Sequence, residues 1–417
     1  MKFISFLIAL FIKAGSCFAL LPIIGPAEIT NREISTVILV SMDGFRADYW
    51  EKVETPRFHE LMKYGVLASN LKPVFPSVTF VNHYSIVTGL YAEHHGIVNN
   101  TMWDPNTGRK FEISDTKEVN RSEWWQGEPI WVTAEKQGVK TASMFWVGSS
   151  AEIGGYRPTY WFNYDASFAR SKRVQQVLEW LDYPKDKKPN FITLYFEDVD
   201  EAGHAYGPDS DQVKRTIKDL DSSLGELWDG IKARGLQDKV AMILVSDHGM
   251  AKVEKKNRIR INDYVKKSEA KVVGKGALSL VWPNSVVDSD LILERVKKAP
   301  GKFTVLRKEK MPEEFHYANH PRISPLVFSA HLGWYIDTGV FPSIKPKVFG
   351  LHGYDNSLPE MQAVFLAIGP RFPKNRKVGP VLNVDIYSLI AELIKVLPAK
   401  TDGKLSRIAD TVGLLNP

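Results

Sequence analysis

Four short runs of apolar residues lie along the chain, and each has the length of a buried β-strand. The segments between them show helical periodicity, most clearly at 213–231, where apolar residues recur every three or four positions. Asp209 or Ser210 can cap the start of this helix, and Gly235 can end it. The pattern predicts an α/β fold with a mostly parallel sheet and helices on both faces. The four runs are 37–40, 191–196, 242–245 and 363–367, and all four are expected to be parallel.

Residues from about 259 to 335 show a different pattern. Short β-like runs at 278–282 and 303–306 flank a helical pattern at about 288–298. We interpret this segment as a small α+β insertion. Residues 20–417 are therefore expected to form one domain that carries the insertion at about 259–335.

The first residues are typical of a targeting signal. Met1 and Lys2 precede an apolar run at 3–12, which is too short to span a bilayer. We predict a signal peptide at 1–19; Cys17 leaves a lipoprotein anchor as the weaker alternative. Because Cys17 is the only cysteine, the mature chain would have no disulfide. This favours a secreted or periplasmic protein of bacterial origin.

The composition is that of a globular protein, with 44% hydrophobic and 24% charged residues. The excess of 54 Lys and Arg over 48 Asp and Glu gives a net charge of +6, and no basic run stands out. Nucleic-acid binding through a basic face is therefore not indicated. No later segment is long and apolar enough to be a membrane anchor.

Acidic and histidine residues collect at one end of the predicted strands. In an open α/β sheet, ligands bind outside the carboxyl ends of the strands. Three Asp and three His fall there, which are enough ligands for two metal ions, and these residue types suit zinc. Asp200 and His204 share a face if they lie on a helical turn. The set is Asp43, Asp200, His204, Asp247, His248 and His352.

Two metal ions about 4 Å apart can clamp a phosphoryl group during displacement, which requires a nucleophile. Thr79 precedes a helix-like segment at 81–90, and backbone N–H groups at a helix N-terminus favour anions. Thr79 could instead be a plain N-cap. Ser77 competes as nucleophile on the same argument.

Eight short motifs in this order resemble the nucleotide pyrophosphatase/phosphodiesterase family of the alkaline phosphatase superfamily. The resemblance runs from about residue 37 to the end of the chain. It implies an alkaline-phosphatase-like fold and a stand-alone bacterial catalytic domain. The motifs are SMDGFR at 41–46, FPSVTFVNHY at 75–84, TGL at 88–90, HHGI at 94–97, GEPIW at 127–131, GHAYGP at 203–208, SDHGM at 246–250 and HGYDN at 352–356.

The resemblance implies two Zn²⁺ ions. Motif matching gives one ion to Asp43, Thr79, Asp247 and His248. It gives the other ion to Asp200, His204 and His352. Thr79 is the implied nucleophile, and Asn100 the implied hydrogen-bond donor to the phosphoryl oxygen. Seven other histidines stay outside the metal set; among them, His83, His94 and His95 are interpreted as structural, and His316, His320 and His331 are unassigned.

The implied activity is that of a type I phosphodiesterase releasing nucleoside 5′-monophosphates from small-molecule nucleotide diesters or pyrophosphates. Phe80 and Tyr195 match positions that sandwich the base in nucleotide-cleaving relatives, and Trp146 is expected to line the same pocket. Tyr195 could instead be a core residue, since it lies in a strand. Because aromatic rings also suit a choline ammonium, a phosphocholine-type lipid phosphodiesterase remains an alternative. A second alternative is an inactive nucleotide-binding relative.

Overall fold

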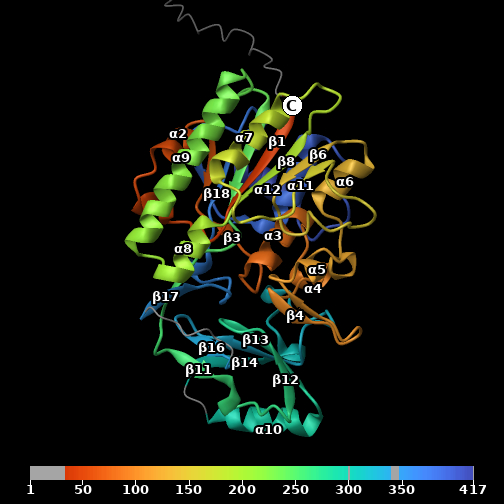
Figure 1. The fold of residues 1–417 in the computed structure, drawn as a ribbon, viewed down its shortest axis with the longest axis vertical. Helices are drawn as coiled ribbons and strands as arrows, with labels where there is room; N and C mark the ends of the chain where they lie inside the picture. Colours follow the sequence, from red (N-terminus) through yellow and green to blue (C-terminus); the bar gives the residue numbers. More distant parts are fainter. Residues whose placement is uncertain (1–32, 299–300, 340–346, 417) are drawn as a thin grey trace, which may run out of the picture. The chain divides into compact units, whose positions relative to one another are not determined.

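The computed structural model describes residues 33–298, 301–339 and 347–416, and its largest element is an eight-stranded sheet (Figure 1). Its strand order is β19-β2-β18-β9-β1-β8-β6-β7. The runs predicted at 37–40, 191–196 and 242–245 form the parallel central strands β1, β8 and β9. The signal peptide predicted at 1–19, with Cys17, lies outside the described residues. The strands are β1 Thr36–Met42, β2 Gly65–Ala68, β6 Thr141–Met144, β7 Tyr160–Trp161, β8 Phe191–Phe196, β9 Val240–Val245, β18 Phe365–Ile368 and β19 Arg376–Val378.

The fourth predicted strand runs in the opposite direction, so the expectation that it is parallel was wrong. Strand β18 pairs antiparallel with both β9 and β2, whereas the other five pairings in this sheet are parallel. A strand buried on both faces is apolar in either direction, so the apolar run does not reveal its direction. The reversal places the residues that precede β18 at the same edge as the residues that follow β1, β8 and β9.

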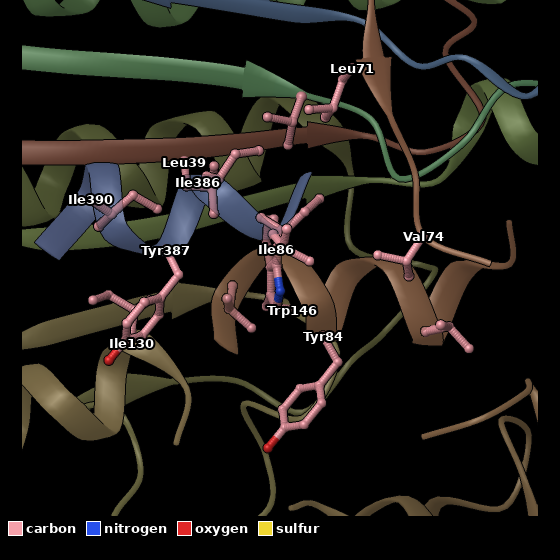
Figure 2. Packing of buried hydrophobic residues seen from close by; sticks show 14 of the residues in the cluster. Leu39, Leu71, Val74, Tyr84, Ile86, Ile130, Trp146, Ile386, Tyr387 and Ile390 are labelled. Carbon is pink, nitrogen blue, oxygen red and sulfur yellow. The ribbon is translucent and has the colours of Figure 1, made fainter. Parts of the chain in front are cut away.

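Helices cover both faces of the sheet, as the pattern predicted. Successive residues of β1 alternate between two core clusters, with Val37 and Leu39 in one and Ile38 and Val40 in the other. Figure 2 shows Leu39 in the first cluster with Ile386 and other side chains of α11. The first cluster includes residues of α3 Thr79–Thr88, α6 Ile130–Lys136, α11 Ile386–Ile394 and α12 Leu405–Val412, and the second includes residues of α2 Pro56–Met62, α7 Arg170–Leu181 and α9 Asp211–Ala233.

The long helix α9 begins where the sequence indicated. The Ser210 side chain accepts a hydrogen bond from the Val213 backbone N–H, which caps the helix. Gly235 follows the last turn with φ +63°, a conformation that glycine adopts without strain.

Residues 259–335 contain a four-stranded antiparallel sheet of order β12-β13-β15-β14 with its own buried cluster. Helix α10 packs on β13, and Ile292 of this helix is fully buried in the cluster. Strands β11 and β16 pair at the two ends of the segment. The elements are β11 Arg258–Arg260, β12 Ala270–Val273, β13 Leu278–Pro283, α10 Val286–Lys297, β14 Phe303–Arg307, β15 Leu326–Ala330 and β16 Tyr335–Asp337.

Short elements complete the fold around one edge of the main sheet. Helix α8 follows β8, strand β17 pairs antiparallel with β10, and β4 forms a hairpin with β5. Among the described residues, no helix combines the length and apolar character needed to cross a bilayer. These elements are α1 Tyr49–Lys52, β3 Leu71–Lys72, α4 Ala92–His95, β4 Thr101–Trp103, β5 Lys110–Glu112, α5 Thr116–Val119, α8 Asp198–Tyr206, β10 Ala251–Glu254, β17 Val348–Leu351 and β20 Val381–Leu382.

Candidate metal centre and active site

The structure brings the six Asp and His side chains of the predicted metal set to one edge of the sheet. Asp43 directly follows β1, and Asp247 and His248 follow β9. Helix α8, which follows β8, carries Asp200 and His204 one turn apart. The sixth residue, His352, directly follows β17 in the segment that leads into the antiparallel strand β18.

The ligand atoms approach one another in two groups. In the first, His248 Nε2 lies 2.9 Å from Asp247 Oδ2 and 3.6 Å from Asp43 Oδ1. In the second, His352 Nε2 lies 3.1 Å from His204 Nε2 and 3.7 Å from Asp200 Oδ1. The rings of His248 and His352 stack with centroids 3.5 Å apart, which joins the two groups.

Hydrogen bonds fix the tautomer of each histidine in the set. In all three rings, Nδ1 lies within hydrogen-bond distance of a backbone carbonyl, which only accepts, so Nδ1 carries the proton and Nε2 keeps a lone pair. The Nε2 lone pairs of His204 and His352 therefore face each other, an arrangement that a shared cation would stabilise. The bonds run from His204 to Gly350 O at 2.9 Å, from His248 to Gly249 O at 2.8 Å and from His352 to Ser77 O at 3.0 Å.

Three carboxylate oxygens beside these nitrogens are buried and accept no hydrogen bond from any described residue. They are Asp43 Oδ1, Asp200 Oδ1 and Asp247 Oδ2. Burial raises the pKa of Asp43 well above its ordinary value, and the charges of Asp247 and Asp200 raise it further. Burial also lowers the pKa of His352 well below its usual range, with His248 adding to the effect. Carboxylate oxygens without a hydrogen-bond donor, together with imidazoles whose Nε2 keeps a lone pair, fit zinc in both chemistry and number.

His83 also lies in this cluster, beside Asp43 and Asp247. It is fully buried, and its Nδ1 donates to the Thr79 carbonyl at 3.0 Å. Its Nε2 lies 2.7 Å from Ser41 Oγ, so the lone pair accepts the serine hydroxyl. With both ring nitrogens engaged, His83 connects strand β1 to the helix that carries Thr79.

The structure distinguishes the two hydroxyls that the sequence left open. Thr79 is the first residue of α3, whose N-cap is Val78. The Thr79 Oγ1 therefore does not cap the helix and lies 3.2 Å from His248 Nε2. Ser77 is fully buried and donates its hydroxyl hydrogen to the Tyr354 carbonyl at 2.7 Å. Of the two, only Thr79 faces the metal ligands.

Asn100 lies beside Phe80, the residue that follows Thr79. Its Oδ1 accepts the backbone N–H of Phe80 at 2.9 Å, which orients the amide group. The Nδ2 hydrogens have no hydrogen-bond acceptor among the described residues. The amide group is therefore held in place, and both Nδ2 hydrogens remain available to donate to a ligand.

The predicted aromatic residues have different environments. Phe80 is partly exposed and packs on Phe111 and Trp125. The Tyr195 hydroxyl donates to Asp43 Oδ2 at 2.7 Å, which attaches this side chain to the metal ligands. Its ring also contacts Tyr164, whose centroid lies 6.1 Å away.

The expectation that Trp146 lines the substrate pocket was wrong. Its side chain is 5% exposed, its Nε1 donates to the His83 carbonyl at 3.1 Å, and it lies within the core cluster (Figure 2). Tyr164, which no motif singles out, is instead 53% exposed beside Tyr195. The sequence gives no signal for Tyr164, because its exposure depends on distant residues.

Five further histidines outside the metal set make local contacts. His95 bonds Ser85, and His94 pairs with Asp402. In the segment between β14 and β16, His316 stacks on Tyr91, His320 contacts Gln126 and His331 bonds Thr304. None of these five is part of the metal-ligand groups found among the described residues.

Comparisons with known proteins show the fold and the family of this chain. The structure of an inactive variant of murine ectonucleotide pyrophosphatase/phosphodiesterase 5 in complex with AMP has a TM-score of 0.85 and 35% identity. It covers 91% of this chain and 100% of that chain. This match shows the alkaline-phosphatase-like fold that the motifs implied.

Sequence relatives come from snakes, yeast and humans. Venom phosphodiesterase CdcPDE of Crotalus durissus collilineatus is 38% identical over 386 residues, 89% of this chain and 46% of the venom protein. A Schizosaccharomyces pombe protein described as an uncharacterized pyrophosphatase/phosphodiesterase is 37% identical over 409 residues, 92% of this chain and 82% of its own. The chain spans about half the length of the venom relatives. Because these relatives are eukaryotic, the bacterial origin stays a prediction.

The family match covers most of the chain. Residues 37–355 match the family described as type I phosphodiesterase / nucleotide pyrophosphatase. This span includes all six residues of the metal set, together with Thr79 and Asn100. The chain belongs to the type I phosphodiesterase / nucleotide pyrophosphatase family.

Proposed function

We propose that the protein is a zinc-dependent phosphodiesterase that releases nucleoside 5′-monophosphates from nucleotide diesters or pyrophosphates. One observation carries the proposal: three imidazole lone pairs and three unpartnered buried carboxylate oxygens converge beside the Thr79 hydroxyl. Such a set is costly in a folded protein unless cations bind it. A purely structural role would not explain why these carboxylate oxygens and imidazole lone pairs are buried together.

The zinc ligands proposed from the motifs are Asp43, Thr79, Asp247 and His248 for one ion and Asp200, His204 and His352 for the other. When bound, the ions supply positive charge that lowers the pKa of a coordinated hydroxyl and stabilises the leaving oxygen. The fit rests on the tautomers and on the unpartnered oxygens described above.

The residues of the chain divide the chemistry among them. The Thr79 oxygen would lose its proton to solvent and attack phosphorus while the bond from phosphorus to the leaving-group oxygen breaks, so that the leaving group departs and the nucleotide stays on Thr79 as a phosphothreonine ester. Water would then cleave this ester, which releases the nucleoside 5′-monophosphate and restores the Thr79 hydroxyl. Asn100 donates from Nδ2 to a non-bridging phosphoryl oxygen, because its Oδ1 is already held by the Phe80 N–H. His83 fixes the first turn of α3 through the Thr79 carbonyl.

The substrate is proposed to be a diester whose nucleoside lies between aromatic rings. Phe80 supplies one ring, and the exposed Tyr164 supplies the other in place of Tyr195, whose hydroxyl is bound to Asp43. The AMP bound to the murine relative supports a nucleotide substrate. Arg46 donates to Asp48 and to the Met250 carbonyl, so it does not offer the extra cation that a monoester dianion requires.

Export from the cell is part of the same proposal. It is supported by the signal peptide predicted at 1–19 and by the venom relatives.

A substrate panel with controlled metal content tests the proposed function. Thymidine 5′-p-nitrophenyl phosphate and ATP should yield TMP and AMP, whereas p-nitrophenylphosphocholine should react slowly. Dialysis against a chelator should abolish the activity, and zinc should restore it as metal analysis approaches two ions per chain. Full activity in a metal-free sample would contradict the proposal. Faster cleavage of the choline ester than of the nucleotides would instead support the phosphocholine-type lipid phosphodiesterase.

A further inference from the structure

The edge of the main sheet opposite the candidate metal centre carries a row of lysines, and we call it the amino edge. All strands of this sheet except β18 begin at the amino edge, because β18 alone runs in the opposite direction. A lysine stands one to three residues before several of these strands, so lysines far apart in the sequence meet at one edge. They are Lys63 before β2, Lys140 before β6, Lys188 before β8, Lys239 before β9 and Lys374 before β19.

The connections that lead into the strands at the amino edge have an excess of positive charge. Those that precede β1, β2, β6, β8, β9 and β19 contain nine Lys and Arg against four Asp and Glu. The whole chain of 417 residues has a net charge of +6. Positive charge is therefore concentrated at this edge. The connections are residues 33–35, 63–64, 137–140, 182–190, 234–239 and 369–375.

Only the two arginines of these connections are paired with acids. Arg234 pairs with Asp182 at 2.7 Å, which lowers the pKa of Asp182, with a smaller effect from Lys188. Arg371 pairs with Glu392 at 2.7 Å. None of the seven lysines forms an ion pair with an acid of the described part of the chain, and all are at least partly exposed. The lysines are Lys63, Lys140, Lys185, Lys187, Lys188, Lys239 and Lys374, and the remaining acids of the connections are Glu33, Asp186 and Asp238.

An exposed leucine lies beside this row of lysines. Leu397 is 80% exposed, more than any other large hydrophobic residue in the described part of the chain. Its backbone N–H donates to Gln137 Oε1 at 2.9 Å, and its carbonyl accepts from Gln137 Nε2 at 2.9 Å. Gln137 lies in the connection that leads into β6, three residues before Lys140. These bonds hold the backbone of Leu397 at the amino edge, where its apolar side chain is exposed to solvent.

We propose that the amino edge binds the surface of a bilayer that contains anionic lipids. Neighbouring strands lie about 4.8 Å apart, so the lysines before β19 and β6, six strand positions apart, span roughly 30 Å. A row of this width fits an extended anionic surface better than a single small anion. Lysine ammonium groups bind the lipid phosphates, and a leucine side chain enters the boundary between headgroups and acyl chains. A nucleic-acid backbone would use the ammonium groups but not Leu397.

Binding at the amino edge leaves the candidate active site accessible. Strand β1 runs from Thr36 at the amino edge to Met42, which directly precedes Asp43 of the metal set. Its seven residues separate the two edges by about 20 Å. Protein bound to a bilayer through the lysines should therefore still meet small soluble substrates. The inference does not depend on the proposed function, because none of the lysines belongs to the catalytic set.

Cosedimentation with lipid vesicles tests the inference. Wild-type protein should bind vesicles of phosphatidylcholine with about 30% phosphatidylglycerol, should not bind pure phosphatidylcholine, and should be released by salt. Lys187→Gln/Lys239→Gln should lower the partition coefficient about 25-fold, since each lysine near an anionic surface contributes about fivefold. Lys298→Gln/Lys310→Gln is the matched control, because it removes two exposed lysines that form no ion pair in the described part of the chain. The control should bind like wild type.

The leucine separates a bilayer from other polyanions. Leu397→Ser should lower the partition coefficient about tenfold on the anionic vesicles and leave binding to a DNA duplex unchanged. Thermal unfolding at wild-type temperature for every variant shows that the fold is intact. Equal binding by wild type and Lys187→Gln/Lys239→Gln, or an equal loss in the control, would overturn the inference. Tighter binding of wild type to the duplex than to the vesicles, without an effect of Leu397→Ser on either, would overturn it in favour of nucleic acid.

Discussion

Two of the regions in which the protein buries charged side chains, the surroundings of Arg322 and the candidate metal centre, differ in how those charges are compensated. Arg322 is 4% exposed and makes four hydrogen bonds, one of them from Nε to Asp104 Oδ2 at 2.9 Å. The other oxygen of Asp104 accepts the Asn106 N–H at 2.9 Å. Burial raises the pKa of Asp104, but its bond to Arg322 and other contacts outweigh burial and keep the pKa below its ordinary value.

The candidate metal centre lacks this compensation. Asp43, Asp200 and Asp247 are close enough to raise the pKa of Asp43, and each has an oxygen that accepts no hydrogen bond from a described residue. Both regions contain buried carboxylates, so burial alone does not distinguish them. A cluster of buried carboxylate oxygens without hydrogen-bond donors, rather than buried charge, therefore distinguishes the candidate metal centre from the Arg322 region.

The largest effect is expected for the nucleophile. Thr79→Ala should lower kcat by at least about 10³-fold, because it removes the attacking oxygen, while zinc content and unfolding temperature change little. Steady-state kinetics with metal analysis checks this. Thr79→Ser should keep partial activity, and Ser77→Ala is the matched control with near-normal turnover per folded molecule. A fully active Thr79→Ala protein beside an inactive Ser77→Ala protein would reverse the assignment.

The second-largest effect is a loss of stability in the region around Arg322, where the buried charges are paired. Arg322→Ala should lower the free energy of unfolding by about 3–5 kcal/mol, because Asp104 then stays buried without its partner. Urea unfolding measures the loss. Arg234→Ala is the control, since it breaks an exposed pair with Asp182 that contributes about 1 kcal/mol or less. Equal losses of unfolding free energy in Arg322→Ala and Arg234→Ala would show that the buried pair contributes no more to stability than the exposed pair.

The third effect is a change in stability on replacing a buried Asp by Asn, and its sign is expected to differ between the two regions. In metal-free protein, Asp43→Asn should stabilise the fold by about 1–3 kcal/mol, because one unpaired buried charge disappears. Asp104→Asn should destabilise the same metal-free protein. Zinc should stabilise wild type more than Asp43→Asn, which thermal unfolding with and without zinc can measure. If both substitutions shifted stability in the same direction, the comparison would fail.

The smallest effect is a pH dependence. Because the folded pKa of Asp104 is lowered, its contribution is fully present above the carboxyl pKa of the unfolded chain, about 3.9. It is lost as pH falls through the lower folded pKa. Metal-free wild type should therefore be more stable than Asp104→Asn at pH 6, and this difference should shrink below about pH 4. A constant difference measured by urea unfolding from pH 6 to pH 3 would contradict the role of the ionised carboxylate.

Hydrophobic patterns in the sequence predicted the central strands and the helices on both faces, and the positions of the acidic and histidine residues predicted which of them meet at one edge of the sheet. Hydrophobic periodicity depends on burial, and burial of β1, β8 and β9 is a local property of each run. Once the strands are parallel, chain topology alone brings Asp43, Asp247 and the start of α8 to one edge. The convergence of these residues was therefore predictable before any distance was known.

Strand direction, hydrogen-bond partners and side-chain exposure could not be predicted from the sequence, because they depend on tertiary contacts. Strand β18 is apolar in either direction, and its antiparallel pairing with β9 is what brings His352 to the ligand edge. Ser77 and Thr79 are chemically similar, and the contacts with Tyr354 and His248 separate them. Trp146 and Tyr164 are both aromatic, yet one is buried and the other is exposed. Each of these outcomes depends on residues far away in the chain, and local sequence patterns carry no information about such contacts.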